Sequence, residues 1–226
     1  MHRYSMLADN DRVLIAVSGG VDSLVLAWVL NHWQHKAPIR YETLAVFIDN
    51  GLDSTTGTRV AGQLQKIGVP HEIAKTDFWS RAAAAEDGKS TCYHCARLRR
   101  NRLFAIAEER NCNKISFGHH KDDILETFFI NLLYAGNIST MVPKQKLFNG
   151  RIHIIRPLAF LEKEDIREIA AAASLIPVKN PCPLDSNSKR QEARKVLAYL
   201  SQLDPRTKSN IFAALSNIRQ DYLLAG

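Results

Sequence analysis

One short string in this chain combines small, hydroxyl and acidic residues in the way that a phosphate-binding turn requires. The string Ser-Gly-Gly-Val-Asp-Ser follows an apolar run at residues 13–17 and precedes a second apolar stretch at residues 23–31. Its two glycines allow a tight turn and a close approach of the backbone to a ligand. The amides at the start of the next expected helix favour an anion, above all a phosphate. The candidate phosphate-binding residues are therefore Ser18, Gly19, Gly20, Val21, Asp22 and Ser23.

Three of the four cysteines have a spacing that suits metal or redox chemistry. Cys92 and Cys95 form a Cys-X-X-Cys pair, and Cys182 lies in a Pro-Cys-Pro turn far along the chain. Three thiolates suit a zinc ion completed by water or histidine, and they equally suit a 4Fe–4S cluster with one open iron. A dithiol redox pair is the third possibility. The residues alone leave these three open, whereas Cys112 is expected to be a packing residue.

Two acidic residues are candidates for catalysis with Mg²⁺. The Asp22 carboxylate lies inside the glycine turn, where it repels a phosphate unless Mg²⁺ or a structural role compensates. Asp122 comes shortly after an expected strand, and carboxylates at the carboxyl ends of parallel strands are well placed to hold the Mg²⁺ of a nucleotide. For Asp122 a helix cap is an equally good interpretation.

Basic residues are concentrated in two stretches that suit the phosphates of a nucleic acid. The first contains no acidic residue between Lys89 and Arg102, and the second follows Cys182. Binding through such residues weakens as salt rises. A solvated helix face is the alternative for any single arginine. The candidate RNA-binding residues are Arg97, Arg99, Arg100, Arg102, Lys189 and Arg190.

These side chains need a scaffold that brings several strand ends together. Apolar runs at residues 13–17, 43–48, 71–75, 114–117 and 152–155 predict five strands, and stripes with helical spacing lie between them. This alternation predicts a doubly wound α/β fold with a mainly parallel five-stranded sheet. A turn-rich segment from residue 180 to 188 then separates a domain over residues 1–180 from C-terminal helices. The appendage over residues 181–226 would carry Cys182, with helices at 191–203 and from Asp204.

Composition fits an ordinary globular protein. The basic surplus favours a polyanionic partner, although charge alone is better explained by a merely basic soluble protein. Of the 226 residues, 46% are hydrophobic and 23% are charged, and the formal net charge is +7. No apolar run reaches the roughly 20 residues that cross a bilayer. The first residues lack the apolar core of a signal peptide. We therefore expect a cytoplasmic protein without a membrane partner and without structural disulfides.

Several motifs, in the order in which they occur, resemble those of the PP-loop ATP pyrophosphatases and, among them, of the tRNA 2-thiocytidine synthetases. The string at residues 18–23 resembles the PP-loop. Residues 92–100 look like the CxxC-x-R-L-R-R segment of these synthetases, and residues 118–127 look like their GHHxDDxxxT segment. The strings Ile-Arg-Pro-Leu-Ala at 155–159 and Asn-Pro-Cys at 180–182 also match in kind and order. The similarity runs from about residue 13 to residue 182.

This resemblance implies a Rossmann-like fold and ATP-dependent thiolation of a tRNA cytidine. The family enzyme adenylates the 2-oxygen of the cytidine, and sulfide then displaces AMP. Cys92, Cys95 and Cys182 would hold a 4Fe–4S cluster, and ATP with Mg²⁺ would be the other cofactors. The resemblance also implies sulfide or a sulfur-donor protein as a partner, and a homodimer. Phe47 and Ile48 would pack the adenosine, and Gly118 would let the nucleotide approach.

Two departures from the family pattern keep other functions open. Val21 stands where the family loop commonly has lysine, and Cys182 lacks the second cysteine that many family members have nearby. One alternative is a PP-loop sulfurtransferase that acts on another nucleobase or on a small molecule. The other is a zinc-stapled RNA-binding module without catalysis.

Overall fold

The chain divides into two compact units in the computed structural model, which describes residues 1–184 and 189–224. The first unit comprises residues 1–120 and 143–184, and the second comprises residues 121–142 and 189–224. The predicted boundary at residue 180 differs from this division. The helix at residues 121–135 groups with the C-terminal helices because its apolar face packs on them, and Cys182 belongs to the first unit. The end of the predicted turn segment, residues 185–188, lies outside the described residues.

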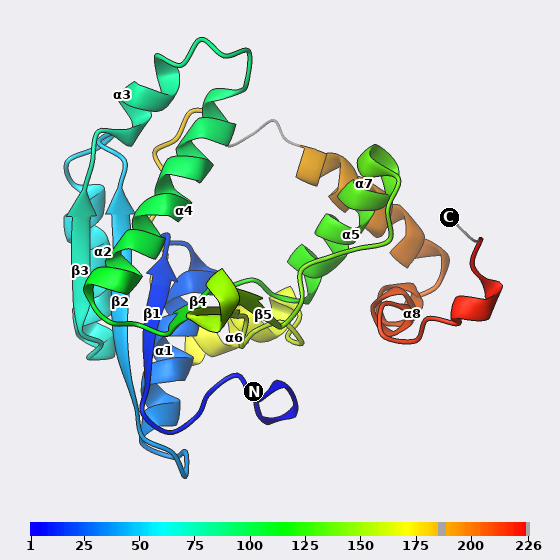
Figure 1. Ribbon diagram of the computed structural model, residues 1–226, viewed down its shortest axis with the longest axis horizontal. Coiled ribbons are helices and arrows are strands. Elements are labelled where there is room, and N and C mark those ends of the chain that lie inside the picture. The colour runs from blue at the N-terminus through cyan, green and yellow to red at the C-terminus, as the bar shows by residue number, and fades with distance from the viewer. Residues whose placement is uncertain (185–188, 225–226) are drawn as a thin grey trace. The chain divides into compact units, whose positions relative to one another are not determined.

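A six-stranded sheet forms the centre of the first unit, with the strand order β3-β2-β1-β4-β6-β5 (Figure 1). All neighbouring strands are parallel except β5, which runs antiparallel to β6. The order of the strands reverses direction between β1 and β4, and ligands bind at such a point in doubly wound sheets. The predicted α/β fold with a mainly parallel sheet is confirmed. The strands are β1 (Asp11–Val17), β2 (Tyr41–Asp49), β3 (His71–Lys75), β4 (Lys114–Ser116), β5 (Lys144–Leu147) and β6 (Ile152–Ile155).

The predicted number of five strands is wrong, because the sequence does not mark β5. Its residues are Lys-Gln-Lys-Leu, so they show neither an apolar run nor a clear alternation. β5 lies at the edge of the sheet and is joined to β6 through the 3-10 turn η2 (Phe148–Gly150). Lysine is typical of edge strands because its charge opposes pairing with another chain. The pairing with β6, rather than the pattern of its own side chains, therefore defines this strand.

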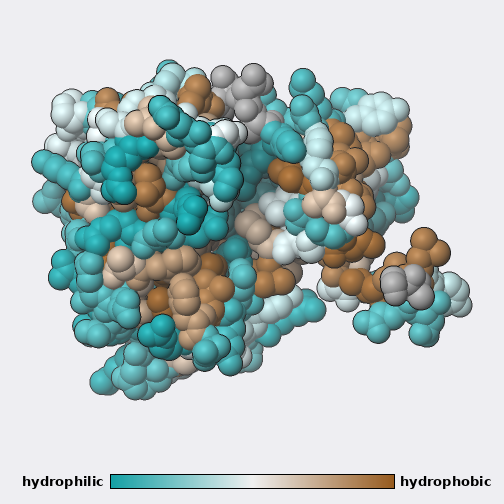
Figure 2. Space-filling model, turned by 45° about the horizontal axis from the view of Figure 1, so that its top comes forward, coloured by the Kyte–Doolittle hydropathy of each residue, from teal (hydrophilic) through white to brown (hydrophobic). Residues whose placement is uncertain are grey.

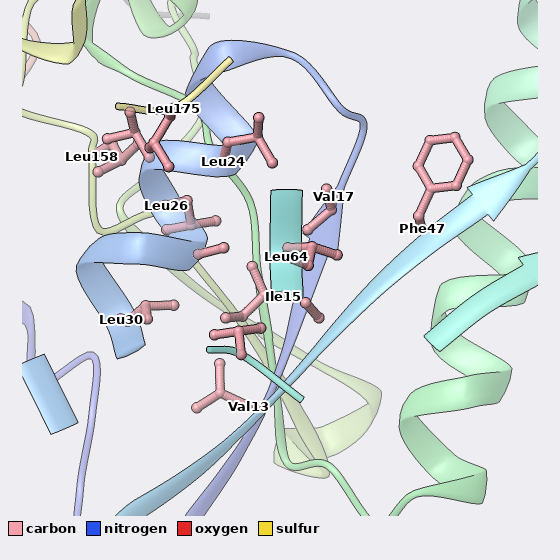
Figure 3. Close-up of a cluster of buried hydrophobic side chains, with 14 of the residues drawn as sticks. Val13, Ile15, Val17, Leu24, Leu26, Leu30, Phe47, Leu64, Leu158 and Leu175 are labelled. Atoms are coloured by element: carbon pink, nitrogen blue, oxygen red, sulfur yellow. The ribbon is translucent and has the colours of Figure 1, made fainter. Parts of the chain in front are cut away.

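Alternate residues of the central strands point to opposite faces of the sheet. On one face Val13, Ile15 and Val17 of β1 are buried with Leu24 and Leu26. Figure 3 shows these side chains gathered between the strand and the helix that follows it. That helix is apolar nearly all round, as its deep burial requires. The helices that contribute to this core are α1 (Val21–Gln34), α2 (Thr56–Ile67) and α6 (Lys163–Ala172).

The other face of the sheet is covered by the helices α3 (Phe78–Ala83) and α4 (Thr91–Glu109). Leu14 and Ile115 of the strands are buried there together with Leu103 and Ile106 of α4. α4 begins after Ser90, whose side chain accepts a hydrogen bond from the Tyr93 backbone N–H at 3.2 Å. This cap fixes the start of the helix at the residues that precede the Cys-X-X-Cys pair.

Three helices, α5 (Lys121–Ala135), α7 (Lys189–Leu203) and α8 (Thr207–Ala214), make up most of the second unit. Their common core contains Leu125 and Phe129 of α5 and Leu197 of α7. The sequence predicted a helix from Asp204, but α8 begins three residues later. The Asp204 carboxylate accepts a hydrogen bond from the Arg206 backbone N–H at 2.7 Å, so residues 204–206 form a turn before the helix.

Large apolar side chains are exposed on both units. Figure 2 shows hydrophobic areas separated by hydrophilic ones on the face that it draws. In the second unit the exposed apolar residues include Leu132, Leu133, Tyr134, Ile138, Tyr199, Leu203, Ile218, Tyr222 and Leu223. Over residues 1–184 and 189–224, no helix is both long enough and apolar enough to cross a membrane.

Candidate active site

The phosphate loop, residues 18–23, joins the end of β1 to α1 and is braced by its own serines. Ser23 Oγ accepts a hydrogen bond from the Ser18 backbone N–H at 3.1 Å and donates one to the Gly20 carbonyl at 2.8 Å. Gly20 is the N-cap residue of α1 and has no side chain that could cap the first amides of the helix. An anion at this end of the helix would be stabilised by the first amides and by the helix dipole.

Gly19 adopts a conformation that only glycine adopts easily. Its φ angle is +84°, and a Cβ atom there would lie 2.9 Å from Cγ2 of Val60 in α2. Its carbonyl accepts a hydrogen bond from the Val178 backbone N–H at 2.9 Å. The loop is therefore held between α2 and the segment that follows α6.

Gly118 brings the end of β4 directly against the start of α1. A Cβ atom at this position would lie 2.9 Å from the carbonyl oxygen of Asp22. The residue thus permits close packing of two backbones at the point where the strand order reverses. Gly118 is not among the residues that line the neighbouring cavity.

A cavity of about 380 Å³ lies at the carboxyl ends of the strands in the first unit. The phosphate loop contributes Ser18 and Gly20 to its wall, whereas Gly19, Val21, Asp22 and Ser23 are not among the lining residues. Phe47 and Ile48, at the end of β2, also line it. The three candidate ligands Cys92, Cys95 and Cys182 and the predicted Arg99 also line this wall. The structure therefore brings the phosphate loop and the three thiols to one cavity.

The three thiols influence one another electrostatically. Burial raises the pKa of Cys95 most strongly, the Arg99 guanidinium lowers it, and the Cys182 and Cys92 thiolates raise it again. Cys92 is exposed, and Cys95 and Cys182 are half-buried. In the described parts of the chain no three His, Cys, Asp or Glu side chains are grouped as ligands of a single metal ion. The three thiols line a cavity and are not gathered at the position of a single metal ion.

The four arginines of α4 have different environments. Arg97 and Arg100 are exposed, and Arg102 forms an ion pair with Glu109 at 2.7 Å. Arg99 instead lines the cavity, and its buried Nε has no hydrogen-bond partner among the described residues. Arg99 therefore lies with the thiols and the phosphate loop rather than on an outer surface.

The Asp22 carboxylate has two basic neighbours in the first unit. Its Oδ1 lies 2.5 Å from Nζ of Lys163 and 3.7 Å from Nε2 of His120. Arg156, which follows β6, is buried, and its Nε donates to Nδ1 of His119 at 3.2 Å. Burial lowers the pKa of Arg156 to about 10, so this side chain keeps its charge at neutral pH.

The remaining predicted residues belong to the second unit. Asp122 accepts from Lys208 Nζ, with a distance of 2.5 Å between Nζ and Oδ1. Lys189 Nζ lies 4.4 Å from the centre of the Tyr134 ring, and Arg190 lies 3.6 Å from the Asp123 carboxylate. These contacts all join α5 to α7 or α8, so each of these side chains also has a structural role within the unit.

The cavity residues that were not predicted from the sequence include Asn50, Asp53 and Trp79. Asn50 Oδ1 is buried without a hydrogen-bond partner among the described residues. Hydrogen bonds from Thr55 and Thr56 lower the pKa of Asp53. Asn50 and Asp53 follow the end of an expected strand, so the rule that ligands bind at strand ends would have found them. No sequence signal marked Trp79, whose backbone N–H donates to the Asn50 carbonyl at 3.0 Å.

Known proteins are similar to this chain in sequence and in fold. The model of a PP-loop domain matches residues 2–200. A tRNA-cytidine(32) 2-sulfurtransferase of Alkalilimnicola ehrlichii is 39% identical over 223 residues, which cover 97% of this chain and 71% of the relative. One of Syntrophotalea carbinolica is 34% identical over 224 residues, which cover 98% of this chain and 86% of the relative.

Among solved structures, the U34-tRNA thiolase NcsA of Methanococcus maripaludis, determined with its [4Fe-4S] cluster, has a TM-score of 0.77. It is 23% identical, and the match covers 97% of this chain and 74% of the thiolase. This likeness shows a common fold. The matched PP-loop domain and the identity along nearly the full chain show more: the protein belongs to the PP-loop family and, within it, to the tRNA-cytidine(32) 2-sulfurtransferases.

Proposed function

We propose that this protein is an ATP-dependent tRNA sulfurtransferase that replaces the 2-oxygen of a cytidine with sulfur. One observation carries the proposal: the phosphate loop and the thiols of Cys92, Cys95 and Cys182 line the same cavity. An enzyme that activates a base with ATP and then delivers sulfur to it needs both sites within reach of one substrate atom.

The residues at the carboxyl ends of β1 and β2 are proposed to bind ATP. The backbone amides of residues 18–23 and the Ser18 hydroxyl would hold the phosphates. Phe47 and Ile48 supply an apolar wall for the adenine, and Trp79 supplies an aromatic face for a second base. Asp22 and Asp122 are the proposed catalytic acidic residues, and the Asp122 carboxylate would coordinate the Mg²⁺ of ATP.

The chemistry requires activation before substitution. The C2–O bond of cytosine resembles that of an amide, so its oxygen is a poor leaving group. Attack of this oxygen on the α-phosphate of ATP forms an O–P bond and releases pyrophosphate. Sulfide then forms a bond to C2, the C2–O bond breaks, and the oxygen leaves as part of AMP. The chain would orient the base at the mouth of the cavity and exclude water from the activated intermediate.

The donor set fits a [4Fe–4S] cluster held by Cys92, Cys95 and Cys182. Three thiols around a cavity leave one corner of a cluster without a protein ligand. The repulsion between neighbouring thiolates, which contributes to the raised pKa of Cys95, is relieved when they bind a cation. When bound, the cluster supplies an iron site at which sulfide is held as a nucleophile at neutral pH. Arg99, whose Nε lacks a partner among the described residues, would face the same ligands.

The proposal also includes tRNA as the substrate and further partners. The exposed Arg97 and Arg100 on α4, and Lys189 and Arg190 on α7, would contact tRNA phosphates. The sulfur would come from sulfide or from a sulfur-donor protein. The exposed apolar side chains of the second unit support a second copy of the chain as a partner. Such a substrate implies a cytoplasmic enzyme.

Thiolation of tRNA by the anaerobically purified protein tests the proposal. Unmodified tRNA, ATP with Mg²⁺ and sulfide should yield 2-thiocytidine in nucleoside mass spectrometry, and omission of ATP should abolish the product. A thiolated uridine would instead favour a sulfurtransferase for another nucleobase. Zinc without iron or sulfide in the purified protein, together with no thiolated nucleoside, would favour the RNA-binding module and contradict the proposal.

A further inference from the structure

The phosphate loop of this protein presents an electrostatic problem that its own residues do not solve. Residues 18–23 contain one carboxylate, that of Asp22, and no cationic side chain, because Val21 stands where related loops commonly have lysine. A triphosphate bound at the start of α1 would lie beside this carboxylate, and like charges at short range repel. A cation from elsewhere in the chain is therefore expected near the loop.

The structure supplies this cation from a distant part of the sequence. Lys163 is the first residue of α6, and its Nζ lies 2.5 Å from Oδ1 of Asp22 although 141 residues separate the two. The two side chains are 29% and 32% exposed, so solvent and a bound anion can reach both. The ammonium group therefore lies at the phosphate loop without belonging to it.

The packing of α6 fixes Lys163 in this place. A capping box starts the helix, in which the Asp165 side chain accepts from the Glu162 backbone N–H at 2.7 Å. Ile166 and Ala170 are buried in the same core as Leu24 of α1. Because residues three and seven positions apart share one face of a helix, Lys163 lies on the face that α6 turns toward this core. The lysine is thus positioned by the fold rather than by chance on a mobile surface.

We propose that Lys163 is the phosphate-binding cation of this loop and takes over the task of the lysine that Val21 replaces. The proposal rests on ATP binding as part of the proposed function. A lysine ammonium has three donors, so Lys163 can keep its bond to Asp22 and donate to a phosphate oxygen. Asp22 then holds the ammonium beside the phosphate site. An ion pair that tethers α6 to α1 is the competing explanation, but partly exposed pairs stabilise folds only weakly.

The test is equilibrium binding of α,β-methylene-ATP with Mg²⁺ to the full-length protein, because this analogue resists cleavage between its α- and β-phosphates. Lys163→Met should weaken binding at least about tenfold, since a hydrogen bond to a charged group contributes about 1.5–3 kcal/mol. Lys163→Arg should retain most of the affinity. Lys66→Met, which removes an exposed lysine in the last turn of α2, is the matched control and should bind like the wild type.

A double variant that moves the positive charge from α6 into the loop makes the test sharper. In the double variant Val21→Lys/Lys163→Met the cation returns to the loop, and affinity should recover to within about threefold of the wild type if charge is what matters. Unchanged melting temperatures would show that each variant is folded. Wild-type affinity in Lys163→Met, or no recovery in the double variant, would overturn the inference. Failure of the wild type to bind the analogue would instead count against the proposed function.

Discussion

At the scale of single residues, Cys182 and Cys112 allow the proposed ligands to be separated from packing cysteines. Cys182→Ala should abolish iron and sulfide binding and the absorbance near ~400 nm that thiolate-bound clusters give. Its melting temperature should stay near that of the wild type without cluster, because Cys182 lies at the wall of the cavity and outside the core. Metal analysis, absorbance and thermal unfolding of anaerobically purified protein provide the measurements.

Cys112→Ala is the matched control, because this thiol is buried in the core that α4 and Ile115 share. The substitution should leave the iron content unchanged and lower the free energy of unfolding by about 1 kcal/mol through lost packing. The assignment of ligands would be refuted if the iron content fell in Cys112→Ala and not in Cys182→Ala.

Gly19 and Gly62 test whether the loop backbone is under steric constraint. Gly19 has a φ angle of +84°, and an added Cβ would meet Val60 at 2.9 Å, whereas nothing lies within 4 Å of a Cβ at Gly62. Gly19→Ala should therefore lower the free energy of unfolding by about 1–3 kcal/mol and impair ATP binding. Gly62→Ala, inside α2, should raise it by about 0.5–1 kcal/mol. Urea unfolding of both variants measures the difference, and equal effects would contradict the model of the loop.

At the scale of helices and strands, the sequence predicted elements whose side chains repeat with a clear period. β1 and α1 carry continuous apolar stretches, so they were predicted close to their observed bounds. β5 and α3 have no such pattern, because β5 is a polar edge strand and α3 has only six residues. The functional residues show the same limit. The phosphate loop and the Cys-X-X-Cys pair are local strings that the sequence reveals, whereas Trp79 lines the cavity and Lys163 contacts Asp22 only through the packing of α3 and α6.

The edge of the sheet predicts a pH dependence of stability. His153 of β6 lies opposite Lys146 of β5 and beside Lys114 of β4. Burial, and then the charges of Lys114, Lys144 and Lys146, lower the pKa of His153 below its usual value of about 6.5. The unfolded chain therefore binds a proton more readily as pH falls below 6.5, so this histidine destabilises the fold there and has no such effect above.

Replacement of His153 isolates this effect. His153→Gln should lose less unfolding free energy than the wild type when the pH falls from 7 to 5, with little difference between the two slopes above pH 7. Lys146→Gln should show an intermediate slope, because it removes one of the charges that disfavour the histidinium. Denaturant titrations at several pH values give these slopes, and identical slopes in all three proteins would contradict the argument.

At the scale of the whole molecule, the net positive charge says less about function than the positions of the individual charged side chains. The net charge of +7 predicted a polyanionic partner without identifying the residues that bind it. The structure separates the four arginines of α4, which the sequence alone did not. Arg97 and Arg100 are exposed, Arg102 is paired with Glu109, and Arg99 lines the cavity. Composition therefore left the partner open, and the fold reduces the candidate contacts to a few side chains.

This arrangement predicts how salt affects tRNA binding by variants of equal net charge. Arg97→Gln/Arg100→Gln removes two exposed charges on α4, whereas Arg12→Gln/Arg167→Gln removes two that are paired with Glu42 at 2.8 Å and Glu164 at 3.3 Å. Each lost phosphate contact lowers the slope of log affinity against log salt by about 0.7–0.9. The first variant should bind tRNA more weakly with a slope reduced by about 1.5, and the second should resemble the wild type. Equal losses in titrations from low to high salt would mean that net charge, rather than the surface of α4, attracts the RNA.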